Sequence, residues 1–207
     1  MSNAAHHVVL ARSLALVSLL ALPSCVDRVD ELDTAEAALL SCPCPAETPA
    51  VLAPPANQSL AFVLDATGVQ QYVCNTTATG AAWTLVAPMA DLIDNGFVVG
   101  KHYAGPTWEV NDGSTVVGAR VQGATIDATA IPWLLLSAVG HGGTWLGAMS
   151  NVTAIQRLAT TGGLPPATGC NVDLLGATAD VPYTAKYFFY RTSILPSQFN
   201  TRCGATP

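Results

Sequence analysis

Short runs of alternating apolar and polar residues, separated by tight-turn sequences, fill the chain from residue 60 onward. In the run Val181–Arg191, the odd-numbered residues from 183 to 189 would face one way and the even-numbered residues the other. Because side chains alternate between the two faces of a β-strand, this period of two predicts half-buried strands. We therefore expect this part of the chain to be built from β-sheet.

Turn sequences place the predicted hairpins. Asn95-Gly96 lies between the runs 91–94 and 97–103, and Asn111-Asp112-Gly113-Ser114 lies between the runs 107–110 and 115–121. Asn-Gly and Asp-Gly supply the positive φ angles that tight hairpin turns require. The pair Thr67-Gly68 is predicted to turn between the runs 60–64 and 70–74.

The remaining segments also favour strands over helices. We expect strands at Ile131–Val139, Thr144–Met149 and Val152–Ala159, and a Gly- and Pro-rich loop at Thr161–Gly169. No convincing helix of three turns is present, and short strands recur as in an antiparallel barrel or sandwich. The predicted fold class is all-β: a single antiparallel β-barrel or β-sandwich domain with long loops.

Composition and charge narrow the classes of partner. Hydrophobic residues make up 50% of the 207 residues and charged residues only 11%, which favours a packed interior over disorder. The formal net charge is −6, but six of the fourteen acids lie between Asp27 and Glu47. From residue 59 onward there are eight acids and six Lys or Arg, so the body offers no basic surface for phosphates. We expect no nucleic-acid partner.

The N-terminus has the order of a secretory signal. A weakly basic start is followed by the apolar run Ser13–Leu22 and the small residue Ser24. The run is too short to cross a bilayer, so residues 1–24 are predicted to be a cleaved signal peptide. Leu22-Pro23-Ser24-Cys25 is similar to a lipobox, which would make Cys25 the lipidated first residue of a bacterial lipoprotein. Only this lipid would then contact the membrane.

Residues 25–58 are predicted to form a tether, acidic at first and then Pro-rich, because neither part has the periodicity of a packed element. The β domain is expected over residues 59–207.

Export favours disulfides, because the compartment outside the cytosol is oxidising. Five cysteines remain besides Cys25, so at most two intramolecular bridges can form. These candidates are Cys42, Cys44, Cys74, Cys170 and Cys203. Only Pro43 separates Cys42 from Cys44, which suits a bridge between these two poorly. The connectivity stays open.

A set of short segments spans nearly all of the mature body. They are Gly68-Val-Gln-Gln-Tyr-Val-Cys74, His102-Tyr-Ala-Gly-Pro-Thr-Trp108, Asp112-Gly-Ser114, Ile155-Gln-Arg157, Thr161-Gly-Gly163 with Cys170, and Tyr183-Thr-Ala-Lys-Tyr-Phe-Phe-Tyr190. In order and spacing these segments resemble the secreted domain-of-unknown-function family DUF3455. The resemblance implies an extracytoplasmic domain found in bacteria and fungi, and it brings no established reaction.

Acid–base or metal chemistry would draw on few residues. His102, His141 and Glu109 are the histidines and the glutamate of the mature body, and with Asp112 they form a conceivable metal or hydrolytic set at one end of a barrel. The sequence has neither His-x-His nor His-Glu-x-x-His spacing, and no Gly-x-Ser-x-Gly or Gly-x-Gly-x-x-Gly motif. We predict no metal and no cofactor, and a metal-dependent or hydrolytic secreted enzyme is the alternative function.

Aromatic residues offer a second kind of site. A sugar-binding platform could form from Trp83, Trp108, Trp133 and Trp145 with Tyr72 and Tyr103, although core packing is the default interpretation in an all-β domain. Trp108, close to Glu109 and His102, is the best candidate for an exposed functional ring. The predicted ligand-binding residues are therefore His102, Tyr103, Trp108, Glu109, Asp112 and His141.

The predicted function is non-enzymatic: an exported envelope or extracellular domain that binds a small molecule, a glycan or other polymer, or an envelope protein. The export signal, the tether and the β body support this prediction, together with the lack of a coherent catalytic set. A structural role in a coat or matrix is a third alternative, which self-association without ligand binding would favour.

Overall fold

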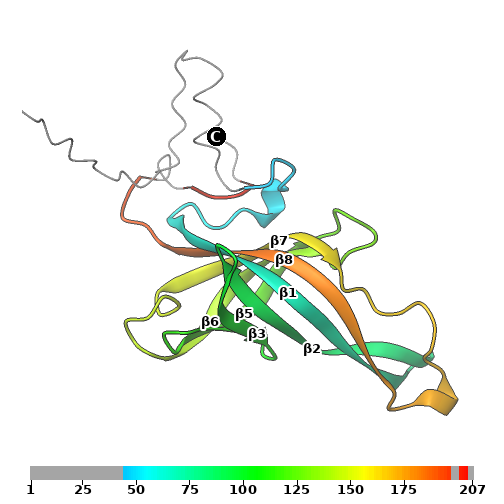
Figure 1. Ribbon diagram of the computed structural model, residues 1–207. Helices are drawn as coiled ribbons and strands as arrows, with labels where there is room; N and C mark the ends of the chain where they lie inside the picture. Colours follow the sequence, from blue (N-terminus) through cyan, green and yellow to red (C-terminus); the bar gives the residue numbers. More distant parts are fainter. Residues whose placement is uncertain (1–43, 197–200, 205–207) are drawn as a thin grey trace, which may run out of the picture.

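Eight antiparallel strands form a closed barrel in the computed structural model, which describes residues 44–196 and 201–204 (Figure 1). The strands are β1 (Gln58–Thr77), β2 (Gly80–Asp94), β3 (Phe97–Tyr103), β4 (Thr107–Val110), β5 (Ser114–Ala124), β6 (Trp133–Gly143), β7 (Val152–Gly162) and β8 (Thr178–Thr192). Each strand pairs with the next, and β8 closes the ring by pairing with β1. The all-β prediction is confirmed, and of the two predicted architectures the structure is the barrel.

Two short 3-10 helices, η2 (Ala50–Leu52) and η3 (Val172–Leu174), complete the regular structure of the described residues. Neither they nor any other helix within 44–196 and 201–204 has the length and hydropathy needed to span a membrane. The predicted signal peptide, Cys25, Cys42 and the tether up to residue 43 lie outside the described residues.

Two of the predicted tight turns are confirmed. Asn95 and Gly96 have φ angles of 48° and 84° and connect β2 to β3. Gly113, with φ of 80°, lies in the turn between β4 and β5. These positive φ angles are the reason that Asn and Gly occupy the turns.

The predicted turn at Thr67-Gly68 is wrong, because β1 runs through it without interruption. Gly68 pairs with Ala90 of β2 on one side and with Tyr183 of β8 on the other. A Cβ atom at Gly68 would lie 2.0 Å from the carbonyl oxygen of Met89. The glycine therefore permits a close approach of two strands, which is a recognised role of glycine inside a sheet.

The later strand predictions are right for two segments and wrong for a third. The run Ile131–Val139 falls largely in β6, and Val152–Ala159 falls in β7, which continues to Gly162. The segment Thr144–Met149 is a loop. Its backbone amides find side-chain acceptors instead of a strand partner: Ala148 N donates to an Asp112 carboxylate oxygen at 2.7 Å, and Met149 N donates to Ser114 Oγ at 3.0 Å.

Successive side chains of β8 point to opposite faces of the sheet, as the sequence predicts, and they pack into two separate clusters. Tyr187 and Phe189 belong to the cluster inside the barrel, whereas Phe188 and Tyr190 belong to a second cluster on the outer face. Residues 44–57 and 201–204 cover this outer face, and we call these two segments the strap. Leu52 of the strap is fully buried against the outer cluster.

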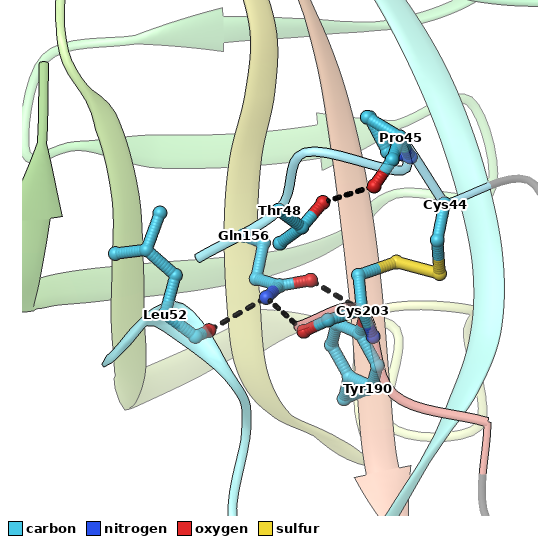
Figure 2. The surroundings of a disulfide bond; sticks show 7 residues. All are labelled: Cys44, Pro45, Thr48, Leu52, Gln156, Tyr190 and Cys203. Carbon is cyan, nitrogen blue, oxygen red and sulfur yellow. Dashed lines mark hydrogen bonds between the residues drawn. A yellow bond between two sulfur atoms is a disulfide. The ribbon is translucent and has the colours of Figure 1, made fainter. Parts of the chain in front are cut away.

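The strap is fastened by a disulfide and by one buried glutamine (Figure 2). Cys44 is bonded to Cys203, which joins the two segments of the strap. Gln156 Nε2 donates to the carbonyl oxygens of Leu52 at 2.6 Å and Cys203 at 3.0 Å, and its Oε1 accepts from the Tyr190 hydroxyl at 2.6 Å. Residues 44–57 fall in the predicted tether, yet the structure packs them on the barrel, because Leu52 and Gln156 give them apolar and polar contacts that an alternation rule does not detect.

Beyond the barrel, β1, β2 and β8 continue as a three-stranded arm (Figure 1). The arm exists because β3 pairs only with Ala90–Asp94 of β2 and leaves the first half of β2 outside the ring. A second disulfide, Cys74–Cys170, fixes the arm to the loop before η3. Four of the five candidate cysteines are therefore paired, in two bridges.

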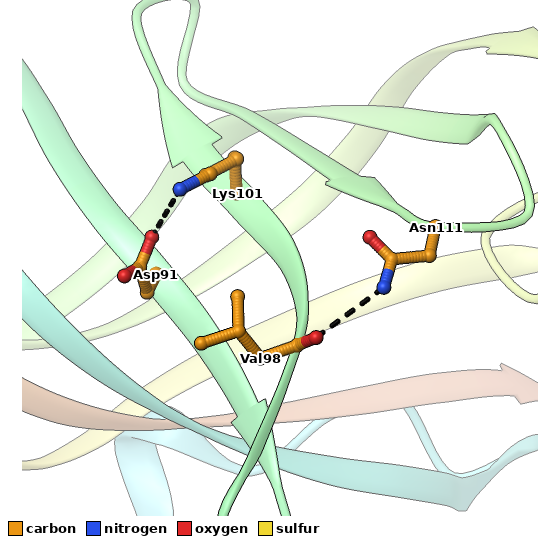
Figure 3. Close-up of polar contacts among 4 residues, drawn as sticks. All are labelled: Asp91, Val98, Lys101 and Asn111. Carbon is orange, nitrogen blue, oxygen red and sulfur yellow. Dashed lines mark hydrogen bonds and ion pairs between the residues drawn. The ribbon is translucent and has the colours of Figure 1, made fainter.

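Side chains on the outer face of β2, β3 and the β4–β5 turn form polar contacts (Figure 3). Lys101 forms an ion pair with Asp91 on the neighbouring strand, and Asn111 Nδ2 donates to the carbonyl oxygen of Val98 at 3.3 Å. Exposed pairs of this kind contribute little to stability. They mark this side of the sheet as the solvent-facing side.

Candidate functional site: a cavity at the open end of the barrel

A cavity of about 670 Å³ opens at the end of the barrel from which the arm leaves. Its rim is formed by residues 85–88 of β2, by the β3–β4 turn at 104–106, and by Ala119 and Arg120 of β5. Its interior is lined by Gln70, His102, Trp108, Leu134, Leu136, Arg157 and Tyr187. A volume of this size falls in the range of pockets that hold small organic ligands.

Cross-strand pairing brings the lining residues together. His102 of β3 pairs with Trp108 of β4, and Arg157 of β7 pairs with Tyr187 of β8 and with Leu134 of β6. Directly paired residues of neighbouring strands project to the same face of a sheet. The cavity walls are therefore fixed by the register of the barrel rather than by loops.

His102 and Trp108 form the aromatic wall of the cavity. Their rings are stacked, with centroids 4.4 Å apart, and the ring of Tyr187 meets both edge-on at 5.0 and 5.2 Å. Trp108 is only 1% exposed. The prediction that Trp108 is an exposed ring is therefore wrong: the residue before it, Thr107, and the residue after it, Glu109, alternate with it, and Trp108 takes the inward position.

His102 is held as a neutral imidazole. Its Nδ1 lies 2.8 Å from the carbonyl oxygen of Thr107, and because a carbonyl only accepts, Nδ1 carries the proton and Nε2 keeps its lone pair. Burial lowers the pKa of His102 to about 3, and the positive charge of Arg157 acts in the same direction. The hydrogen bond to Thr107 opposes the shift without cancelling it.

Arg157 supplies the positive charge inside the cavity. Its Nε and Nη2 atoms both donate to the carbonyl oxygen of Pro132, at 3.2 and 2.8 Å, which fixes the guanidinium group at the wall. The charge acts on the pKa values of four buried or half-buried side chains, Tyr72, His102, Tyr183 and Tyr187. At each of these side chains burial has a larger effect on the pKa than the charge of Arg157 has.

Several buried polar atoms around Arg157 have no hydrogen-bond partner among the described residues. Among the lining residues these atoms are Gln70 Nε2, Trp108 Nε1 and the Tyr187 hydroxyl, and the Tyr183 hydroxyl lies close to that of Tyr187 without a well-formed bond. A buried donor without an acceptor costs roughly 1–3 kcal/mol, so proteins seldom leave one unmatched. Three of these atoms belong to residues that line one cavity.

A comparison with family models matches residues 54–98 and 95–191 to a family described as "Protein of unknown function (DUF3455)". The chain belongs to this family. No curated protein and no solved structure matches the chain. The DUF3455 match runs from before β1 almost to the end of β8, so every residue that lines the cavity lies within it.

Of the predicted site residues, Tyr103 and Glu109 meet on the outer face of this DUF3455 barrel. The Tyr103 hydroxyl donates to Glu109 Oε2 at 2.9 Å, and this bond raises the pKa of Tyr103. Glu109 pairs across the sheet with Lys101, which is exposed. Neither residue lines the cavity described above.

Asp112 and His141 have local structural contacts. Asp112 Oδ1 accepts from the backbone N and the Oγ of Ser114, at 2.8 and 2.6 Å, and these bonds lower its pKa. His141 Nε2 donates to the carbonyl oxygen of Val152 at 2.8 Å. Asp112 thus stabilises the β4–β5 turn and the loop at 144–149, and His141 ties β6 to the start of β7.

The predicted catalytic or metal set is not assembled in the part of the DUF3455 chain that the structure describes. His102 lies inside the barrel, Glu109 lies on its outer face, and no group of three or more His, Cys, Asp or Glu is placed to hold a metal ion in residues 44–196 and 201–204. The tryptophans are likewise dispersed: Trp108 and Trp133 are buried in different clusters, and Trp145 is 80% exposed.

Sequence reasoning missed Gln70, Arg157 and Tyr187 as site residues. A signal for Arg157 was present, because Ile155 lies on the core face of the predicted strand 152–159 and Arg157, two residues later, must share that face. A charged residue on the core face of a strand requires either a partner or a ligand. Gln70 gave a similar signal, since the period of two places it on one face with Tyr72 and Cys74.

Proposed function

We propose that this DUF3455 protein is a non-enzymatic binding domain that holds a small, largely apolar molecule in the open end of its barrel. The observation that carries the proposal is the cavity of about 670 Å³, whose walls combine aromatic and aliphatic side chains with a few buried polar groups. Apolar walls with few, well-placed polar groups are the usual composition of small-molecule sites.

The architecture supports this function. An eight-stranded barrel is just wide enough to be filled by side chains or to hold one small ligand. Here large side chains such as Phe189, Leu92 and Met149 fill one part of the interior, while the part near Arg157 stays open. Because the barrel is a closed ring of paired strands, the cavity is preorganised, which reduces the entropy cost of binding.

We further propose that the domain acts outside the cytosol, as the signal-like residues 1–24 and the lipobox-like Cys25 indicate. The two disulfides fit an oxidising compartment. Lipidation at Cys25 would hold the strap side of the barrel, which carries the N-terminal segment, towards the membrane. The cavity rim is formed by other segments, the first half of β2 and the β3–β4 turn, so the anchor leaves it accessible.

A fluorescence titration with the neutral apolar dye N-phenyl-1-naphthylamine tests the binding function. We expect saturable binding of one dye per chain. Leu134→Trp places a larger ring beside Arg157, with which Leu134 pairs across the sheet, and is expected to weaken dye binding at least about tenfold. Val121→Trp is the matched control, because Val121 is exposed and does not line the cavity. Failure of the wild-type protein to bind the dye, or equal binding by both variants, would overturn the proposal.

A further inference from the structure

The charged side chains that line the cavity are all positive. Arg157 and Arg120 line it, and no Asp or Glu does. The ion pairs among the described residues are Lys101–Asp91 and Lys186–Asp65, and both lie on the exposed outer face. Arg157 therefore has no carboxylate partner in the part of the chain that the structure describes, although the chain as a whole is acidic, with a net charge of −6.

A guanidinium group that has no carboxylate partner inside a barrel would be stabilised by an anion. Taking a cation out of water is costly unless an anion or several acceptors compensate it, and Arg157 has the carbonyl oxygen of Pro132 as its acceptor. His102 adds no charge, because its buried imidazole stays neutral. The cavity thus offers one half-buried positive charge at Arg157, with Arg120 as a second, exposed one at the rim.

The unmatched polar atoms of the lining residues are donors. Gln70 Nε2 and Trp108 Nε1 only donate, and the Tyr187 hydroxyl donates when it faces an acceptor. These donors lack an acceptor among the described residues, and a ligand group that reaches them would supply one. An ionised carboxylate matches this requirement, because it only accepts, has two oxygens, and forms bonds with arginine that are stronger than neutral ones.

We infer that the ligand of this cavity is an amphipathic monocarboxylic acid, whose carboxylate binds Arg157 and the donors of Gln70 and Tyr187 and whose apolar body lies against Trp108, Leu134 and Leu136. This inference rests on the binding function proposed above and adds the chemical class of the ligand. Arg157 is the guanidinium that is fixed at the cavity wall, and its single charge favours a carboxylate over a doubly charged phosphate. The apolar rim at Leu85, Val86 and Pro106 leaves an exit path for the remainder of the molecule.

Calorimetric titrations with decanoate and decanol test the inference, because the two probes share a chain and differ in the head group. We expect wild-type protein to bind decanoate at least about tenfold more tightly than decanol near neutral pH, as a charge-assisted hydrogen bond implies. Arg157→Gln should abolish this preference while retaining decanol binding. Arg157→Lys, which keeps the charge, should retain part of the preference, and Arg120→Gln should retain most of it.

The outcomes separate the two proposals. Equal affinity for decanoate and decanol, or an undiminished preference in Arg157→Gln, overturns the acid-binding inference and leaves the binding function standing. Binding of neither probe, together with failure of the dye titration, overturns the binding function itself. Should Arg157→Gln not fold, the wild-type protein decides: decanoate affinity must fall as pH is lowered through the pKa of the probe, while decanol affinity stays constant.

Discussion

The imidazole of His102 lies flat on the indole of Trp108 inside the barrel, with ring centroids 4.4 Å apart and planes inclined by 11°. The pair joins β3 to β4 and forms the wall of the cavity opposite the positive charge of Arg157. The stack requires an uncharged imidazole, because His102 is only 2% exposed and no carboxylate faces it. Protonation of this one ring would add a positive charge to a cavity that Arg157 and Arg120 already line.

Stability is therefore expected to fall on acidification because of His102. Its pKa is about 3 in the folded protein and near 6.5 in the unfolded chain, so below pH 6.5 the unfolded state takes up a proton that the folded state does not. This contribution to stability is fully present above pH 6.5 and is lost progressively as pH falls towards 3. Between about pH 6.5 and pH 4.5 the loss is expected to be roughly 2–3 kcal/mol, measured by urea unfolding at each pH.

The matched variant is His102→Phe, which keeps a ring against Trp108 and removes the titrating group. Its unfolding free energy should decline much less than that of the wild type across the same pH interval. An equally steep decline in the variant would show that another group causes the pH dependence.

Gly68 should not tolerate even a methyl group. The Cβ of Gly68→Ala would lie 2.0 Å from Met89 O and 2.4 Å from Ala90 Cα, both backbone atoms that cannot move without opening the β1–β2 pairing. We expect a loss of about 1–3 kcal/mol or more in unfolding free energy. At Gly140 the nearest atom to an added Cβ is 3.8 Å away, so Gly140→Ala should stay within about 0.5 kcal/mol of wild type in the same denaturant assay. Similar stability of the two variants would contradict the close strand contact.

The strap disulfide should stabilise the fold without shaping the cavity. Cys44 and Cys203 are separated by 159 residues in sequence, and removing a crosslink over so long a loop typically costs about 2–5 kcal/mol. The double variant Cys44→Ala, Cys203→Ala should lose stability in this range, yet bind the neutral dye with wild-type affinity, because the strap lies on the outer face. Loss of dye binding in a variant that remains folded would place the strap in the site.

Lipidation at Cys25 predicts a distinct mass for the mature protein. When the full chain is expressed in a bacterial host, the N-terminal peptide should begin at Cys25 and carry a covalent lipid, and Cys25→Ser should remove that lipid. Mass spectrometry of the purified protein measures both. An unmodified N-terminus downstream of Cys25 would refute the anchor while leaving export intact.

Much of the fold could be predicted from sequence because hairpins are local. The turns at Asn95-Gly96 and at 111–114 depend on positive φ angles within a few residues, and the alternation in β8 correctly puts Tyr187 and Tyr190 on opposite faces. Ring closure is a non-local property: it depends on β1 pairing with β8, more than 100 residues apart, and alternation alone does not distinguish a barrel from a sandwich. Gly68 failed as a turn because the contact that selects glycine comes from another strand.

The site was harder to predict than the fold, because its residues come from strands that no local pattern brings together. His102 and Trp108 were named as candidates and both line the cavity, but a spacing of six residues does not show that both point inward. Glu109 and Asp112 are close to them in sequence and lie elsewhere, on the outer face and in a turn. Arg157 is far away in sequence and reaches the same cavity through the register of β7 with β8.

A crystal structure of the protein with a bound aliphatic probe tests the central claim, that the open end of the barrel is a ligand site, most directly. Crystals grown with decanoate should show one molecule per chain inside the barrel, with its chain against Trp108 and Leu136 and its carboxylate within hydrogen-bond distance of Arg157. A barrel interior that holds only water, with the probe found on the outer surface or not at all, would contradict the account.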